Sequence, residues 1–261
     1  MSPPPRSLTI LGSGTSMGVP MIGCECKICT SPDPRNSRTR SSALLSVPGG
    51  TILIDTSPEL RLQLVRERVK LVHAVLYTHY HVDHLFGLDD ARVFPHMLKG
   101  PLPIYCTEDV EEVIRQAFSY AFHPPADPNM AFVLPQLQFR RITADPFDLL
   151  GQRITPVPLV HGRFDVLGFR FGDLAYCTDV NQIPDGSWRL LEGLDTLVLD
   201  CLRPGEAHPS HFGLDEALMV VERLRPKRTY FTHLSHKWDY DALPPLPPGV
   251  GLAHDGLRIP F

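Results

Sequence analysis

Short apolar runs separated by glycine- and proline-rich turns dominate this chain, and helical periodicity is confined to a few segments between them. Apolar runs of about four to eight residues bounded by such turns predict β-strands. The predicted strands are 8–11, 42–47, 51–55, 74–77, 103–106, 137–142, 153–157, 167–171, 174–177, 196–200 and 229–232. Helices are predicted near 57–65, 83–88, 108–120 and 214–224, and residues 123–135 and 244–248 are proline-rich loops.

Polar residues mark two of the expected helix starts. Ser57 is a candidate N-cap with Pro58 at the first helical position, and Thr107 is expected to cap the helix over 108–120. Because the strands fall into two runs, each closed by helices, the order of elements differs from a regular strand–helix alternation. It predicts an α+β fold in which two sheets pack face to face with helices on the outside.

Composition and charge narrow the class of protein. The chain has 261 residues, of which 43% are hydrophobic, as is typical of a globular protein. A net charge of −4 argues against a general polyanion binder. No apolar stretch reaches the roughly 18 residues of a membrane span, and no signal-peptide pattern is present. We therefore expect no membrane association, a cytoplasmic location and reduced cysteines.

The most informative motif directly follows the apolar run at 74–77. It places His79, His81, Asp83 and His84 within six residues, so that a strand end projects four metal-capable side chains into a loop. Histidines can also cluster on a solvated surface without any function. The later part of the chain favours a metal site, because similar side chains recur there in matching positions.

These later candidates are His161, Asp179 and His233. Each follows an apolar, strand-like segment and lies near small or polar residues that suit a loop. Any one of them alone is more often a turn residue or a satisfied polar group. Together with the motif at 79–84 they form a set of His and Asp residues at strand ends, where functional sites tend to gather.

Cys24, Cys26 and Cys29 form a second candidate metal site in a loop at 23–29. The alternative is a loop of free thiols, but three exposed thiols this close together would be prone to oxidation. Three thiolates need a fourth ligand to complete a tetrahedral zinc site. The remaining cysteines lie in or beside apolar strands and are predicted to be core residues: Cys106, Cys177 and Cys201.

The His-x-His-x-Asp-His motif, followed in order by a His, an Asp and a His, resembles the metallo-β-lactamase superfamily across essentially the whole chain. The resemblance implies a single domain over 1–261 with an αββα sandwich and two catalytic divalent metals, Zn²⁺ or Mn²⁺. It implies that His79, His81 and His161 hold the first metal, that Asp83, His84 and His233 hold the second, and that Asp179 and a water or hydroxide bridge both.

The opening segment narrows the resemblance to one branch. Residues 11–20, Leu-Gly-Ser-Gly-Thr-Ser-Met-Gly-Val-Pro, followed by the cysteine loop, resemble the PhnP-like proteins. This resemblance implies that His236 completes a structural zinc site with the three cysteines. It also implies that His211, in the segment Pro209-Ser210-His211, lies near the scissile phosphate as a general acid, with Asp83 as the other catalytic residue. His208 is a weaker candidate because it does not match the motif position.

The PhnP-like resemblance implies a hydrolase that cleaves a small or cyclic phosphodiester, of the phosphoribosyl cyclic phosphate type, by attack of a metal-bridging hydroxide. It also implies a role in phosphonate breakdown and allows a homodimer. The exact substrate, the identity of the catalytic metals, the oligomeric state and the pathway are left open by the sequence. Substrate choice is expected to depend on the loops 122–130 and 162–166.

Other functions share the same ligand motif. A tRNA 3′-processing nuclease would need a basic flexible arm or an inserted exosite, and Arg35, Arg38 and Arg40 form a small basic cluster only; a nucleic-acid substrate is therefore disfavoured. A lactonase, a thioesterase or a glyoxalase-II-like hydrolase is a further alternative. So are a PqqB-like cofactor-biosynthesis protein, a diiron oxidoreductase and a metal-binding scaffold without activity.

Overall fold

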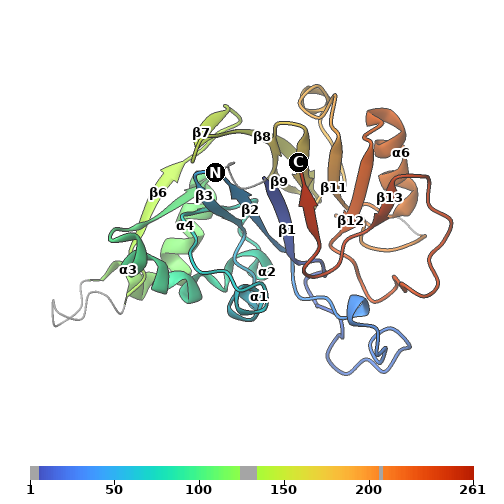
Figure 1. Cartoon of the computed structure of the whole chain (residues 1–261), viewed down its shortest axis with the longest axis horizontal. Helices are drawn as coiled ribbons and strands as arrows, with labels where there is room; N and C mark the ends of the chain where they lie inside the picture. The colour runs from blue at the N-terminus through green and yellow to red at the C-terminus, as the bar shows by residue number, and fades with distance from the viewer. Residues whose placement is uncertain (1–5, 124–133, 206–207) are drawn as a thin grey trace.

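A computed structural model describes residues 6–123, 134–205 and 208–261, which form two mixed sheets packed face to face (Figure 1). The first sheet has the order β14 (Arg258–Pro260), β1 (Ser7–Gly12), β2 (Ser42–Val47), β3 (Gly50–Ile54), β4 (Ala74–Leu76), β5 (Leu102–Cys106) and β6 (Leu137–Arg141). The second has the order β13 (Val250–Leu252), β12 (Arg228–Thr232), β11 (Thr196–Asp200), β10 (Leu174–Cys177), β9 (Phe164–Phe171), β8 (Gln152–His161) and β7 (Phe147–Leu149). The predicted loop 123–135 lies almost entirely outside the described residues.

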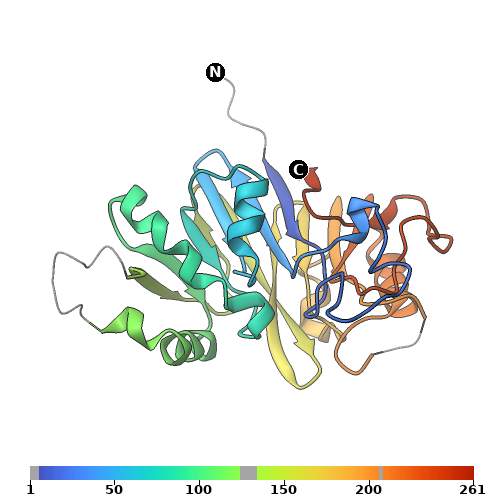
Figure 2. The same ribbon diagram turned by 90° about the horizontal axis from the view of Figure 1, so that it is seen from below.

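Helices cover the outer face of each sheet. The first sheet carries α1 (Leu60–Arg66), α2 (Val82–Leu85), α3 (Phe94–Leu98) and α4 (Glu108–Ala117), and the second carries α5 (Asp185–Trp188) and α6 (Leu214–Leu224). In Figures 1 and 2, α1 to α4 lie on one side of the sheets and α6 lies at the opposite end of the molecule. The predicted α+β class with four αββα layers is confirmed. Among the described residues, no helix combines the length and the apolar character that crossing a membrane requires.

Three buried clusters hold these layers together. The cluster between the sheets contains Leu8, Ile10 and Leu76 from the first sheet and Phe169 and Tyr176 from the second. Side chains with the opposite strand parity pack outward under the helices of the first sheet, as a period of two requires. A third cluster lies between the second sheet and α6. Cys106, Cys177 and Cys201 are fully buried, which confirms their prediction as core residues.

Three helices differ from the sequence prediction in their start, their cap or their length. Helix α1 begins at Leu60 instead of Pro58, and Ser57 does not cap it; the buried Ser57 hydroxyl donates to Gln63 Oε1 (3.0 Å). Thr107 does occupy the N-cap position of α4, yet its hydroxyl makes no capping bond. The helix predicted near 83–88 is shorter, ending at Leu85, and is followed by a 3-10 helix (Leu88–Val93) and α3.

Strand direction brings distant segments to one edge of the sandwich. Strands β3, β4 and β5 are parallel in the first sheet, and β10, β11 and β12 are parallel in the second. Strand β8 is antiparallel to β9, and β9 is antiparallel to β10, so β8 runs in the same direction as β10. The carboxyl ends of these strands therefore converge, and polar residues placed there can form one site.

Candidate active site

Every predicted ligand of the dinuclear site lies at this convergent edge. His79 follows β4, His161 is the last residue of β8, Asp179 lies just beyond β10, and His233 directly follows β12. Asp179 and His233 have left-handed backbones, with φ of 50° and 58°. Non-glycine residues rarely adopt this conformation, and such strained positions are common at functional sites.

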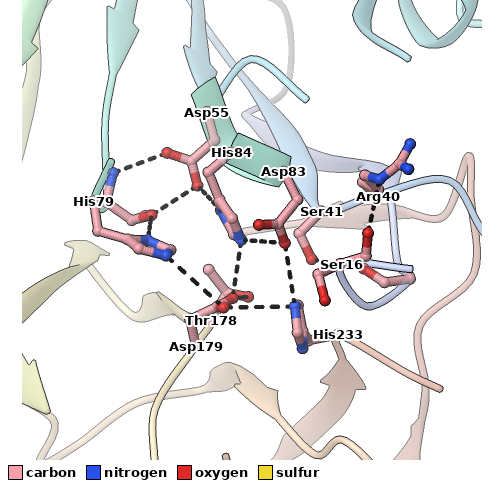
Figure 3. A network of polar contacts seen from close by, with 12 residues as sticks. Ser16, Arg40, Ser41, Asp55, His79, Asp83, His84, Thr178, Asp179 and His233 are labelled. Atoms are coloured by element: carbon pink, nitrogen blue, oxygen red, sulfur yellow. Dashed lines mark hydrogen bonds and ion pairs between the residues drawn. The ribbon is translucent and has the colours of Figure 1, made fainter. Parts of the chain in front are cut away.

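The donor atoms of these residues form two groups that share Asp179. In one group the donor atoms of His79, His81, His161 and Asp179 all lie within 4.8 Å of one another, and in the other the same holds for Asp83, His84, Asp179 and His233. Figure 3 shows Asp179 facing His79 and His84 on one side and His233 on the other. The distances from Asp179 oxygens to imidazole Nε2 atoms are 3.9 Å for His79, 3.7 Å for His161, 3.1 Å for His84 and 3.5 Å for His233.

Hydrogen bonds behind the rings orient three of the imidazoles toward this space. The Nδ1 atom of His84 bonds to Asp55 Oδ2 (2.7 Å), that of His161 to the carbonyl oxygen of Ser210 (2.6 Å), and that of His79 to Thr78 Oγ1 (2.9 Å). If each Nδ1 carries the proton, each Nε2 presents a lone pair to the centre. Within the described residues, four buried atoms have no hydrogen-bond partner: the Nε2 atoms of His79, His84 and His233, and Asp83 Oδ2.

This donor set fits divalent cations. Burial lowers the pKa values of His79, His81 and His161, which favours the neutral imidazole that a metal requires. Burial would raise the pKa of Asp179, but the neighbouring His233 and His84 hold it well below the ordinary value. Neutral imidazoles, ionised carboxylates and orphaned buried acceptors together suit Zn²⁺ or Mn²⁺.

Asp55 supports the site and was missed by sequence reasoning. Its carboxylate is fully buried and accepts bonds from Thr78 N (2.8 Å), Thr78 Oγ1 (2.8 Å) and His84 Nδ1. It therefore fixes both the start of the histidine motif and the ring of His84. An aspartate directly after the apolar run of β3 was a usable signal, since the same pattern identified Asp179 after β10.

His211 lies beside the two groups of metal-capable donor atoms. Its ring stacks on that of His233, with a centroid distance of 4.5 Å, and is also 4.5 Å from the ring of His161. Its Nδ1 donates to Asp200 Oδ2 (2.7 Å), and the same oxygen accepts a bond from Val180 N (2.8 Å). Burial disfavours the imidazolium, but the Asp200 carboxylate outweighs burial and raises the pKa of His211 to about 9.

Asp200 is a second residue that sequence reasoning missed, although it ends the apolar strand β11. It holds the His211 ring so that Nε2 is available to a substrate. His208 is further from the cluster, since its ring is 5.2 Å from that of His211 and its Nδ1 contacts Ser210.

The three cysteines of the 23–29 loop meet His236 as a separate group. Their Sγ atoms lie 3.3 Å (Cys24), 3.6 Å (Cys26) and 3.5 Å (Cys29) from His236 Nδ1. Tetrahedral zinc with its usual bond lengths would separate sulfur and nitrogen ligands by about 3.5 Å. The amide of Cys29 donates to Cys26 Sγ and helps to lower the pKa of that thiol to about 6, which favours the thiolate.

One short segment joins the two metal-capable groups, because His233 and His236 are only three residues apart. Leu234, between them, bonds through its amide to the Ser13 carbonyl (2.8 Å). Arg38 is almost fully buried and donates to the carbonyl oxygens of Ser235 (2.9 Å) and Trp238 (2.8 Å). The segment is therefore fixed from both sides.

The glycine-rich segment 12–18 passes along the same edge. A Cβ atom at Gly12 would collide with the carbonyl oxygen of Arg40, so only glycine allows the two backbones to approach this closely. Arg40 forms an ion pair with Glu59, and its Nε donates to the Ser16 carbonyl (2.8 Å). Figure 3 shows Ser16 on the side of Asp83 and His233, so this segment forms one wall of the site.

Comparison with known proteins agrees with this architecture. A family model described as "Beta-lactamase superfamily domain" matches residues 50–234. The crystal structure of a new diphosphatase from the PhnP family is 43% identical, with a TM-score of 0.90, and the match covers 98% of this chain and 97% of that one. Zn²⁺-bound PqqB from Methylobacterium extorquens has a TM-score of 0.74 over 98% of this chain and 100% of that one; at 21% identity it is similar in fold.

A curated relative differs in length. An octanoyltransferase from Porphyromonas gingivalis is 34% identical over 253 residues, which are 95% of this chain and 50% of that protein. The chain thus spans half the length of this relative.

Proposed function

This chain belongs to the metallo-β-lactamase superfamily and is PhnP-like, and from that premise we propose that it hydrolyses a small or cyclic phosphodiester of the phosphoribosyl cyclic phosphate type. Its family and its clustered donors are those of a metal-dependent hydrolase. The observation that carries the phosphodiester assignment is His211, which Asp200 holds against the metal-capable cluster. The PhnP-family diphosphatase, similar over nearly its whole length, supports a phosphorus-centred reaction.

We assign the metal ligands according to the two groups of donor atoms that share Asp179. His79, His81 and His161 would hold one cation, Asp83, His84 and His233 the other, and Asp179 would contact both. Two divalent cations, Zn²⁺ or Mn²⁺, would supply an activated water and positive charge beside the phosphate oxygens. Asp83 is assigned as a catalytic residue because its buried Oδ2 lies among these donors, 3.4 Å from His84 Nε2 and 3.8 Å from His233 Nε2.

The protein side chains handle the proton of the reaction. Hydrolysis forms one bond from the oxygen of water to phosphorus and breaks the bond from phosphorus to the leaving oxygen. That oxygen must receive a proton if it leaves as an alcohol. His211 is placed to donate it from Nε2, while Asp200 stabilises the ring through Nδ1.

The proposal is tested with purified protein that holds two catalytic cations per chain, as verified by metal analysis. We expect turnover of bis(p-nitrophenyl) phosphate and of ribose 1,2-cyclic phosphate. Protein with full metal content that hydrolyses neither compound would show that the reaction is not phosphodiester cleavage.

Replacing Cys24 by serine should remove one zinc ion per chain and lower the melting temperature. The reason is that a closed zinc site contributes its binding free energy to folding, and loss of one thiolate weakens it. Metal analysis and thermal denaturation provide the measurement. Glu25→Gln is a matched control, since Glu25 is exposed and lies between two of the cysteines; unchanged zinc in Cys24→Ser would contradict a structural zinc site.

Hydrolysis of an acyl thioester is a second candidate, favoured by the relative called an octanoyltransferase. That relative is twice as long as the matched part, so its name does not assign acyl chemistry to the matched half. An assay with octanoyl-coenzyme A beside the phosphodiesters separates the two candidates by relative kcat/KM.

The organisation of residues 1–261 as a single domain, a homodimer and a cytoplasmic location are further proposals, as is a role in phosphonate breakdown. They rest on the resemblance to PhnP-like proteins and on the sequence patterns. A basic surface arm for tRNA would favour the nuclease alternative, and Arg35, Arg38 and Arg40 form a small basic cluster instead of such an arm.

A further inference from the structure

The six cysteines divide into two sets by their accessibility. Cys106, Cys177 and Cys201 are fully buried in the core, whereas the three cysteines of the 23–29 loop are partly exposed. In Figure 1 this loop belongs to the blue segment that follows β1 and projects beyond the sheets. An oxidant in solution would therefore reach the thiols of the 23–29 loop and not those of the core.

Cys26 and Cys29 are placed to form a disulfide with each other. They are three residues apart, the Cys29 amide donates to Cys26 Sγ (3.5 Å), and the sulfur atoms of the loop lie within 4.8 Å of one another. Coordination to a metal keeps such thiols deprotonated, and the thiolate is the form that a peroxide oxidises. Oxidation by hydrogen peroxide joins the two sulfur atoms, while the peroxide takes up two electrons and two protons and leaves as two molecules of water.

This disulfide would dismantle the zinc site. Cys24 and His236 would be the two donors left, whereas a structural zinc ion needs four. His236 would then lose its link to the 23–29 loop. The ion pair between Lys27 and Asp239 (2.7 Å) also joins the loop to this part of the chain, but the Lys27 side chain is 71% exposed, so the pair contributes little.

The loss of this link would reach the candidate active site through residues 233–236. His233, a proposed ligand of the second cation, has φ of 58°, which a non-glycine residue keeps only where its surroundings hold it. The amide of Leu234 bonds to the Ser13 carbonyl (2.8 Å) at the start of this segment, and His236 meets the three cysteines at its end. Arg38 would still bind the Ser235 carbonyl after oxidation, so we expect His233 to be held less firmly but not released.

We propose that the 23–29 loop is a site of reversible oxidation by peroxides, and that a disulfide between Cys26 and Cys29 weakens the binding of the second catalytic cation through His236 and His233. The inference goes beyond the proposed hydrolysis, because it does not depend on which substrate is cleaved. It adds a redox-sensing role to the structural role of the zinc site. Transient disulfides of this kind are the ones found in reducing compartments.

The test uses the full chain with zinc in the cysteine site and Mn²⁺ titrated into the active site. After treatment with hydrogen peroxide, metal analysis should show the loss of one zinc ion per chain, and peptide mass spectrometry should show Cys26 joined to Cys29. The dissociation constant of the more weakly bound Mn²⁺ should rise about ten- to a hundredfold, as is usual when the support of a metal ligand is lost. Dithiothreitol followed by Zn²⁺ should restore the native value.

Two variants and one spectrum separate this route from general damage. His236→Ala should weaken Mn²⁺ binding without any peroxide, because it breaks the same link while all three thiols remain. Cys106→Ala is the matched control, since it removes a buried cysteine and should respond to peroxide as the native protein does. The circular dichroism spectrum of the oxidised protein should stay native.

Three results would overturn the inference. Zinc that stays bound after peroxide treatment would show that the loop is not a site of oxidation. Zinc release with unchanged Mn²⁺ binding would show that residues 233–236 do not connect the two sites, and loss of the native spectrum would show that the effect is global unfolding. All of these measurements are made without substrate, so they are independent of the turnover of bis(p-nitrophenyl) phosphate that tests the proposed function.

Discussion

Replacing Asp179 by alanine should reduce phosphodiester turnover by roughly a thousandfold or more and lower the catalytic metal content of the protein. Asp179 belongs to both groups of donor atoms and is almost completely buried. Its carboxylate faces four imidazoles, at distances of 3.1 to 3.9 Å. In the proposed assignment, its loss would remove a ligand from two cations at once, whereas the loss of any one histidine would affect a single cation. Metal analysis and steady-state kinetics with bis(p-nitrophenyl) phosphate measure both effects.

A control for this variant lies at the opposite end of strand β10. Asp173 is exposed in the turn that precedes β10, at the end opposite to Asp179, so Asp173→Ala changes the same residue type without touching the site. It should retain native turnover and metal content. If Asp179→Ala kept two cations per chain and native kcat, the proposed bridging role would be wrong.

Most strands and the clustering of the site residues were predictable from the sequence, but β7, β13 and β14 were not predicted. Apolar runs predicted most strand positions, because a buried strand needs little besides consecutive β-branched and aliphatic residues. His161, Asp179 and His233 could be selected because each follows such a run, and strand direction then brings them to one edge. The division of these ligands between two metals required the resemblance to the metallo-β-lactamase superfamily, since residue spacing alone does not say which strand ends meet.

The parts that could not be predicted depend on contacts between distant segments. Ser57 was expected to cap α1, but its buried hydroxyl bonds to Gln63, and the helix begins at Leu60. Asp55 and Asp200 follow apolar runs as Asp179 does, yet their roles appear only when His84 and His211 are placed beside them. A strand-end aspartate is thus a signal for a site, but its partner is set by the tertiary fold.

The role of His211 leads to an expectation that depends on the leaving group. If His211 donates a proton to the leaving oxygen, His211→Ala should lower kcat by about a hundred- to ten-thousandfold for an alkyl or ribose leaving group. The effect should be much smaller for p-nitrophenolate, which is stable without a proton. Metal content should stay native, because the proposed ligands are all retained. Kinetics with bis(p-nitrophenyl) phosphate and ribose 1,2-cyclic phosphate provide the comparison.

Asp200→Asn sharpens this test, since the amide oxygen can still accept the bond from His211 Nδ1 but no longer carries a charge. We expect a smaller loss of kcat than in His211→Ala, with the same dependence on the leaving group, because Asp200 acts only through the ring that it positions. His96→Ala, which removes an exposed histidine on α3, serves as the control. A merely structural role of the pair would reduce turnover of both substrates equally. Such a result would leave the metal ligands in place and remove His211 as the proton donor, since loss of a proton donor slows a poor leaving group more than a good one.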